Sequence, residues 1–229
     1  FLETWLPWDK LKRCIMSHSK RWLQEHHSDK FVLQARAEGY LSRAAYKLLE
    51  INKKDKLLKP GCVVVDLGAA PGGWTQVAAE KVGASGAVFA LDRLPLGATP
   101  EGVEFVEGDF TEDAAYNALL DKLAGRKVDL VLSDLAPNMS GHKAVDQPAA
   151  MYLVELAAEF ADKVLASGGS FLVKCFHGVG SEEYIKNMRK KYKQVRVRKP
   201  DASRARSPEF YLLCTGHILQ KNSDIDVGG

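Results

Sequence analysis

The stretch from Val63 to Trp74, VVVDLGAAPGGW, constrains the fold more than any other part of the chain. Three β-branched residues lead into Asp66, a glycine-rich turn follows, and a helical pattern opens at Trp74. A short continuous apolar run is typical of a buried parallel strand. Glycine lets the backbone approach a ligand closely, because it has no Cβ and tolerates positive φ. The stretch therefore predicts a strand, a ligand-binding turn and a helix.

This turn differs from the dinucleotide fingerprint G-x-G-x-x-G. Ala70 replaces the second glycine, which makes room for a pyrophosphate, and Pro71 stiffens the loop. The change argues against NAD and an oxidoreductase. The carboxylate of Asp66 suits a ligand with a positive amino group, and S-adenosylmethionine (SAM) has one and carries no phosphate. The turn glycines Gly68, Gly72 and Gly73 are candidate SAM contacts.

Composition narrows the class of protein. The chain of 229 residues is 46% hydrophobic and 27% charged, which fits one α/β domain with a full core. No apolar run approaches the length of about 18 residues that a membrane span needs. The four cysteines are far apart without a C-x-x-C, and the six histidines show no metal-ligand spacing. We expect a cytoplasmic protein with reduced cysteines and no metal site.

Strand and helix patterns alternate along most of the chain. Strands are expected at 63–66, 87–92, 103–107, 128–133 and 170–174, and helices at 74–82, 113–123, 147–165 and 182–192. Two further strands, at 195–198 and 210–215, are expected to pair antiparallel at the sheet edge. The predicted class is α/β, a Rossmann-like, doubly wound, mostly parallel seven-stranded sheet with an antiparallel edge strand.

An N-terminal helical extension precedes this sheet. Asp29 is expected to cap a helix that Gly39 ends, and Ser42 to cap a second helix from Arg43 to about Asn52. The expected division is an extension at 1–19, an RNA-facing helical segment at 20–59, the SAM-binding domain at 60–217 and a tail at 218–229.

Polar residues stand where the predicted strands end. Asp92, which follows Asp66 by about one βα unit, is placed to accept ribose hydroxyls, and Asp109 is placed beside an adenine edge. Asp134 ends another strand, and Lys174 ends the apolar run SFLVK. A lysine can act as a base only when neutral, a form that burial or a second cation favours. The convergence of these groups on one rim predicts an active site.

Charge is unevenly distributed along the chain. Residues 1–60 hold 13 Lys and Arg against 7 Asp and Glu, residues 61–180 hold 8 against 16, and residues 181–229 hold 11 against 6. If the two basic ends fold onto one face, they form a surface for a polyanion such as RNA. The candidate phosphate contacts are Lys20, Arg21, Arg36, Arg43, Arg196, Arg198, Lys199, Arg204 and Arg206.

From about Arg21 to Thr215 the chain resembles the FtsJ/RrmJ family of large-subunit ribosomal RNA 2′-O-ribose methyltransferases. The matching pieces are RWLQEH, SRAAYKL, VVDLGAAPGGW, GDF, SDLAPNMSG, MYLVELA, GGSFLVK and VRKPDASRARS. Together they are far more specific than a SAM-binding turn alone.

The resemblance implies a Lys-Asp-Lys-Glu catalytic set on Lys47, Asp134, Lys174 and Glu209. Pro208 stands before Glu209 where the family has a more usual polar residue, which changes the approach to this carboxylate but not its presence. The resemblance also implies SAM contacts. They fall on Gly72, Trp74, Asp92, Asp109 and Asp134.

The implied substrate is a uridine ribose in the A loop of large-subunit rRNA, methylated on the assembled subunit by a monomeric enzyme. Lys174 is the candidate base, with Lys47 either favouring its neutral form or stabilising negative charge on the oxygen. Two alternatives stay open: a 2′-O-methyltransferase of another RNA, such as an mRNA cap or a tRNA, and a non-catalytic RNA-binding assembly factor. The intact set of four residues disfavours the second alternative.

Overall fold

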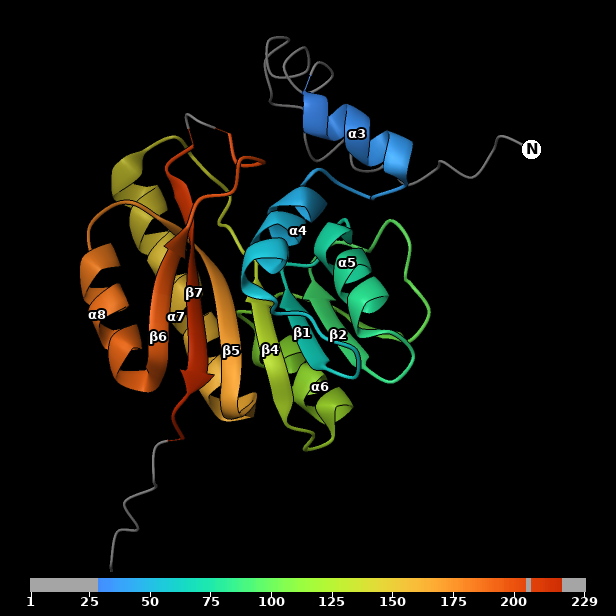
Figure 1. Ribbon diagram of the computed structural model, residues 1–229. Coiled ribbons are helices and arrows are strands. Elements are labelled where there is room, and N and C mark those ends of the chain that lie inside the picture. Colours follow the sequence, from blue (N-terminus) through green and yellow to red (C-terminus); the bar gives the residue numbers. More distant parts are fainter. Residues whose placement is uncertain (1–28, 205–206, 220–229) are drawn as a thin grey trace, which may run out of the picture.

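The computed structural model describes residues 29–204 and 207–219, which form one seven-stranded sheet flanked by helices (Figure 1). The strands are β1 (Val63–Leu67), β2 (Ala87–Asp92), β3 (Val103–Glu107), β4 (Val128–Ser133), β5 (Leu165–Phe176), β6 (Tyr192–Arg198) and β7 (Glu209–His217). The helices are α3 (Lys30–Glu38), α4 (Ala44–Asp55), α5 (Gly73–Val82), α6 (Asp113–Leu123), α7 (Lys143–Val164) and α8 (Ser181–Lys191).

The strand order is β3-β2-β1-β4-β5-β7-β6. Strands β1 to β5 pair parallel, and β7 pairs antiparallel with both β5 and β6. This topology confirms the predicted fold class, including the antiparallel pairing at the end of the sheet that β7 and β6 form. The antiparallel strand itself, β7, lies between β5 and β6, so β6 is the outermost strand. This insertion places β7 directly beside β5.

Helices cover both faces of the sheet (Figure 1). Helices α4 and α5 pack on one face against residues such as Val64, Leu172 and Leu213, and α6, α7 and α8 pack on the other against residues such as Val65 and Phe171. Successive strand residues point to opposite faces. Helix α4 belongs to the segment that was expected to face RNA. Its apolar side packs on the sheet, so that side of the helix is part of the core.

The first two described helices begin in different ways. The Asp29 carboxylate accepts a hydrogen bond from the Phe31 N–H at 2.9 Å, and Gly39 ends α3 with φ of 79°, as predicted. The predicted Ser42 cap is wrong. Arg43 occupies the cap position without a side-chain hydrogen bond to the helix N-terminus, and the buried Ser42 hydroxyl has no hydrogen-bond partner among the described residues. Ser42 instead packs on the turn glycine Gly73, where an added Cβ would lie 2.3 Å from its Oγ.

Other elements are longer than the periodicity predicts. Helix α7 begins at Lys143, before the expected start at 147, with Pro148 inside it. Pro148 lies in the second turn, where it removes one backbone hydrogen bond and crowds the Ala144 carbonyl, yet the helix continues on both sides of it. Strand β5 extends in both directions beyond 170–174 because pairing with β4 and β7 continues past its apolar centre.

Within the described residues, no helix is both long and apolar enough to cross a membrane. The same part of the chain has no group of three or more His, Cys, Asp or Glu side chains placed to hold a metal ion. Cys62, Cys175 and Cys214 are free thiols.

Candidate active site

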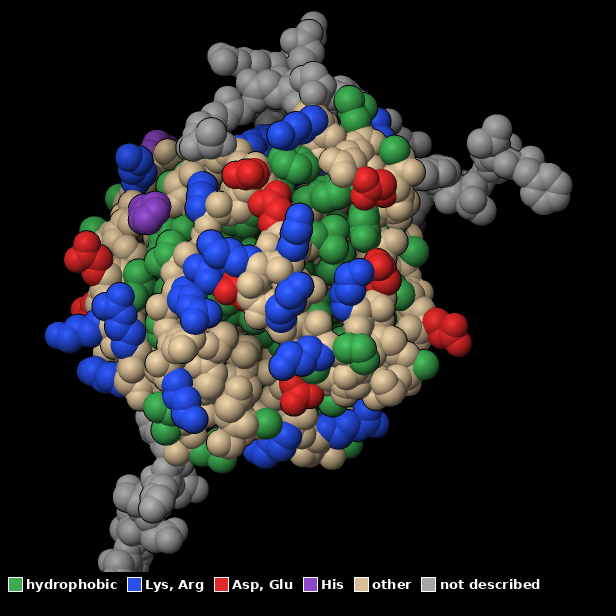
Figure 2. Space-filling model, viewed as in Figure 1, with side chains coloured by type: hydrophobic (Ala, Val, Ile, Leu, Met, Phe, Trp, Pro, Cys, Tyr) green, Lys and Arg blue, Asp and Glu red, His purple; other side chains and the backbone are tan. Residues whose placement is uncertain are grey.

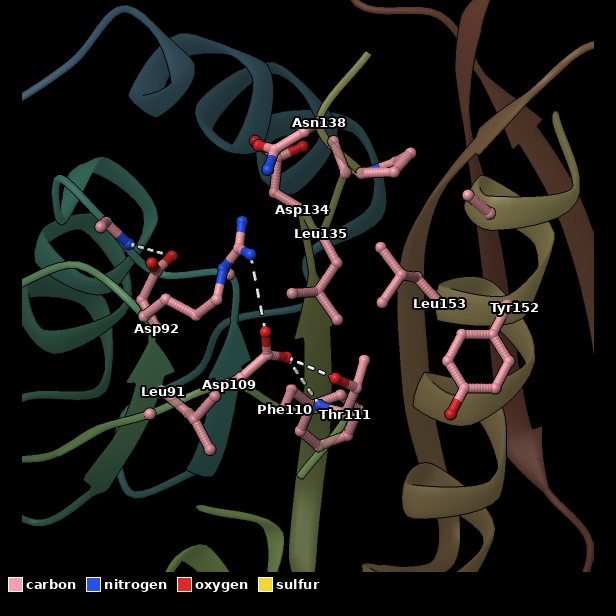
Figure 3. Close-up of a pocket in the computed structure, with 17 residues that line it drawn as sticks. Leu91, Asp92, Asp109, Phe110, Thr111, Asp134, Leu135, Asn138, Tyr152 and Leu153 are labelled. Carbon is pink, nitrogen blue, oxygen red and sulfur yellow. Dashed lines mark hydrogen bonds and ion pairs between the residues drawn. The ribbon is translucent and has the colours of Figure 1, made fainter. Parts of the chain in front are cut away.

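A cleft of about 440 Å³ opens at the carboxyl ends of β1, β2, β3 and β4 (Figure 3). Ligands bind at this edge of open α/β sheets, where the strand order reverses. Asp92 and Asp109 lie at one side of the cleft, Asp134 lies at its upper end, and Leu153 and Tyr152 of α7 face them. The other lining residues are Gly68, Ala70, Leu91, Arg93, Gly108, Phe110, Thr111, Leu135, Ala136, Pro137, Asn138 and Ala149.

Asp92 and Asp109 hold the cleft loops through backbone N–H groups. Asp92 accepts from the N–H groups of Ala70 and Leu94, each at 2.9 Å. Asp109 accepts from the N–H and hydroxyl of Thr111, and the Arg93 guanidinium lies 3.5 Å away. The hydrogen bonds from Thr111, and then Arg93, lower the pKa of Asp109. Each carboxylate has lone pairs left for neutral donors such as ribose hydroxyls.

Of the turn glycines, Gly68 lines the cleft. Its φ of 78° favours glycine, and an added Cβ would lie 2.9 Å from the Leu135 backbone nitrogen. The structure does not place Gly72, Gly73 and Trp74 among the lining residues. They pack on the chain that leads into α4: the Trp74 indole donates to the Ala44 carbonyl at 2.8 Å and is 2% exposed. The assignment of Gly72 and Gly73 as SAM contacts rests on the turn sequence, and that of Gly72 and Trp74 on the resemblance.

Asp66, also predicted to bind the cofactor, is fully buried and does not line the cleft. One carboxylate oxygen accepts from the Thr75 hydroxyl at 2.6 Å, and the other has no hydrogen-bond partner in the described part of the chain. Burial raises its pKa to about 7, against the lowering effect of the Thr75 hydrogen bond. Asp134 and Asp92 raise it further, so this carboxyl carries less negative charge than an exposed aspartate at neutral pH.

The four predicted catalytic residues come together at the upper end of the cleft. The Lys47 ammonium lies 2.8 Å from a Glu209 oxygen, and the Lys174 ammonium lies 3.2 Å from an Asp134 oxygen. Lys174 also donates to the Asp134 carbonyl at 2.6 Å. The four side chains are 9–18% exposed, so the ion pairs are shielded yet reachable from solvent.

Tyr211, which sequence reasoning missed, joins the two ion pairs. Its hydroxyl donates to Asp134 at 2.8 Å and accepts from Lys47 at 3.0 Å. It lies directly opposite Lys174 across the β5–β7 pair, and its ring packs on Trp74 with centroids 5.5 Å apart. The alternation of side chains along a strand could have predicted this position, because Tyr211 is two residues from Glu209 and lies on the same side of β7.

The two carboxylates stay ionised despite burial. Burial raises the pKa of Asp134, but Lys174 and Lys47 and the Tyr211 hydrogen bond outweigh it and lower the value. Burial likewise raises the pKa of Glu209, and Lys47 lowers it below the ordinary range. Asp134 and Glu209 are therefore held in the charged form that can bind and orient the two amines.

Several predicted RNA contacts are occupied within the protein. Arg43 forms an ion pair with Asp29 and donates to the Ala202 carbonyl. Arg198 binds Asp55 through two hydrogen bonds of 2.7 and 2.6 Å. Lys199 donates to the carbonyls of Ser207 and Glu209. These cations hold neighbouring segments of the protein together, and their charge alone did not predict that role.

The other predicted RNA contacts are more varied. Arg36 and Arg196 are exposed, and Arg204 lines a second cleft with Arg43, Ala44, Lys47, Ser207 and Glu209. Lys20, Arg21 and Arg206 lie outside the described residues. Pro208, the departure from the family pattern, accepts from the His177 N–H at 3.1 Å, and Glu209 still reaches Lys47.

Known proteins match this chain over most of its length. A match to the FtsJ-like methyltransferase family spans residues 40–217. The chain belongs to this family. It is 62% identical over 201 residues to Ribosomal RNA large subunit methyltransferase E of Alkalilimnicola ehrlichii, covering 88% of this chain and 96% of the relative. The protein of the same name from Cellvibrio japonicus is 55% identical over 200 residues, covering 87% and 94%.

The fold also matches a solved structure. A candidate ribosomal RNA methyltransferase from Plasmodium falciparum aligns with a TM-score of 0.68 at 27% identity, covering 78% of this chain and 98% of that one. The predicted family and enzyme class, an FtsJ-like methyltransferase, are therefore confirmed.

The cleft of this FtsJ-like methyltransferase fits SAM. Asp92 and Asp109 offer carboxylate oxygens to hydroxyl and amino donors, and Gly68 leaves room along the turn. Among the lining residues the one Lys or Arg is Arg93, which lies beside Asp109. A ligand without phosphates suits this lining better than a dinucleotide does.

Proposed function

We propose that the protein transfers the methyl group of SAM to the 2′-oxygen of a uridine ribose in the A loop of large-subunit rRNA, acting as a monomer on the assembled subunit. The observation that carries the proposal is the double position of Asp134, which lines the cofactor cleft and also contacts Lys174. A group bound in the cleft would end beside the two lysines. The relatives' name supports the rRNA substrate, and the uridine and A loop come from the family resemblance.

When bound, SAM supplies a methyl group on a positively charged sulfur. The ribose hydroxyl is a weak nucleophile until its proton is removed, and Lys174 is the group we assign to accept that proton. The Lys47 charge favours a neutral Lys174 by repulsion, or stabilises negative charge that develops on the oxygen. Asp134 and Glu209 orient the two amines through their ion pairs. Alignment of the hydroxyl with the methyl group contributes as much as the base.

The test is transfer of radiolabelled methyl from SAM to purified large subunits, naked rRNA and tRNA, followed by nucleoside analysis. The expected product is a 2′-O-methyluridine in rRNA of the large subunit. Label in tRNA, and none in rRNA, would replace the proposal with another RNA substrate. RNA binding without any methyl transfer would indicate a non-catalytic assembly factor.

A further inference from the structure

A basic surface lies where the end of α4 meets β6, and neither the cleft nor the catalytic set uses it. Lys53 and Lys54 in the last turn of α4, and Lys56 and Lys59 beyond it, are exposed. Arg196 on β6 is exposed as well. Figure 2 shows Lys and Arg side chains gathered over this face of the molecule. These five residues are termed the α4–β6 basic surface.

The acid within this surface is neutralised. Asp55 is 4% exposed, receives two hydrogen bonds from Arg198, and lies 3.6 Å from the Arg196 guanidinium. This contact also fixes β6 against the end of α4. The lysines around Asp55 therefore present positive charge to solvent, because the nearest carboxylate is already paired with two arginines.

Helix stability explains only part of this arrangement. Lysines in the last turn interact favourably with the helix dipole, by about 0.3–1 kcal/mol each, which accounts for Lys53 and Lys54. Lys56 and Lys59 lie beyond the helix, and Arg196 belongs to a strand on the far side of β7 from β5. The surface thus collects cations from three segments, and the dipole of α4 does not account for all of them.

Helix α4 connects this surface to the reaction centre. Lys54 follows Lys47 by two helical turns, so it lies on the same side of α4 at a distance of about 10 Å along the axis. Beside Lys47 is the second cleft, which also holds Arg43 and Arg204. Glu50, between the two lysines, is engaged by the N–H groups of Asp201 and Ala202. The α4–β6 basic surface therefore begins about two helical turns from Lys47 of the catalytic set.

We infer that the α4–β6 basic surface binds backbone phosphates of the rRNA segment that flanks the target nucleotide. The inference rests on the proposed function, and it adds a contact region remote from the reacting ribose. Phosphate contacts of this kind carry no sequence information but fix register and orientation. They also make affinity fall steeply with salt. RNA fits better than an anionic membrane because the surface lies at the end of the same helix that carries Lys47 of the catalytic set.

The test is a variant in which Lys53, Lys54 and Lys56 are changed together to Glu. The matched control changes Lys186, Arg189 and Lys190 of α8, which are equally exposed and lie on the other face of the sheet, to Glu. Both variants alter net charge equally. Binding of a large-subunit rRNA fragment is measured across salt concentrations for wild type and both variants, together with SAM affinity and the turnover at saturating RNA.

The α4 variant is expected to bind RNA at least about tenfold more weakly, with its salt slope reduced by about 2–3, since each lost phosphate contact removes roughly 0.7–0.9 from that slope. SAM affinity and turnover at saturating RNA should not change. Unchanged RNA affinity would overturn the inference, as would an equal loss in the α8 control or binding to phosphatidylglycerol vesicles in preference to RNA. Because binding is measured apart from methylation, a wild type that binds RNA but fails to methylate rRNA would refute only the proposed function.

Discussion

Asp92 and Asp109 on one side of the rim, and Asp134 and Glu209 on the other, are all carboxylates at strand ends, yet their partners differ. The first pair accepts mainly from backbone N–H groups of the cleft loops. The second pair accepts from lysines and, at Asp134, a tyrosine hydroxyl. Carboxylates held by their own loops shape a cavity and keep lone pairs for neutral donors. Carboxylates held by cations fix where those cations point.

The comparison separates binding from chemistry. Changes on the cleft side should alter cofactor affinity, and changes on the lysine side should alter the rate of the chemical step.

Removing Lys174 should have the largest effect. Lys174→Ala is expected to lower the single-turnover rate by about 10²–10⁴-fold, the usual contribution of a positioned base, while SAM and RNA still bind. Lys174→Arg should be nearly as inactive, since arginine keeps the charge but does not give up its proton. Substantial activity of the Arg variant, with a rate independent of pH, would show that Lys174 acts only as a charge.

Tyr211→Phe should break the bridge between the two ion pairs and keep the ring packed on Trp74. The hydroxyl bonds two charged groups, so its loss is expected to lower the single-turnover rate by about ten- to a hundredfold. SAM affinity should be unchanged. Tyr192→Phe is the control, because the buried Tyr192 hydroxyl has no hydrogen-bond partner within residues 29–204 and 207–219. An equal loss of rate in both variants would show that the Tyr211 hydroxyl does not act by joining the two ion pairs.

Asp92→Ala should weaken SAM binding by about 1–3 kcal/mol, because hydrogen bonds to a charged group are lost. Calorimetry measures the SAM affinity. Thermal unfolding measures how far the loss of the loop hydrogen bonds destabilises the fold. Asp129→Ala is a matched control: Asp129 also accepts from a backbone N–H, that of Val63 at 2.8 Å, but lies at the start of β4. Unchanged SAM affinity in Asp92→Ala would refute the assignment of this carboxylate to the cofactor.

Asp66 should give the smallest effect, a dependence of stability on pH. An unfolded aspartate loses its proton near pH ~4, whereas folded Asp66, with a pKa of about 7, keeps it longer. The folded state therefore binds more protons in this window, and its stability falls as pH rises. Denaturant titrations should show Asp66→Asn gaining about 1 kcal/mol relative to wild type between pH ~6 and pH ~7. A constant difference would mean that Asp66 stays ionised.

Much of the site was predictable because its signals are local. The turn after β1 and the polar residues that end β2, β4 and β5 follow from periodicity and spacing, and the structure places Asp92, Asp109 and Asp134 around one cleft. The roles of Gly72, Gly73 and Trp74 were harder to predict. Their packing against the residues before α4 depends on a segment about thirty residues away in sequence.

The basic residues also show that contacts between distant segments cannot be predicted from local sequence. Arg43, Arg198 and Lys199 were predicted to contact RNA from their charge, and the structure gives each an internal partner. Lys53, Lys54 and Lys56 were not among the predicted RNA contacts, although they are exposed. Charge is a property of a residue type, whereas its availability depends on what the fold brings next to it.

The sequence by itself determined the order of strands and helices, the fold class and the acids that end the strands, because hydrophobic periodicity and turn chemistry act over a few residues. Only the tertiary structure decided which charges meet. The insertion of β7 beside β5 sets Tyr211 opposite Lys174, and the packing of α4 on the sheet brings Lys47 to Glu209. Those pairings join residues 37 and 162 positions apart, so they depend on which strands and helices become neighbours and not on any local pattern.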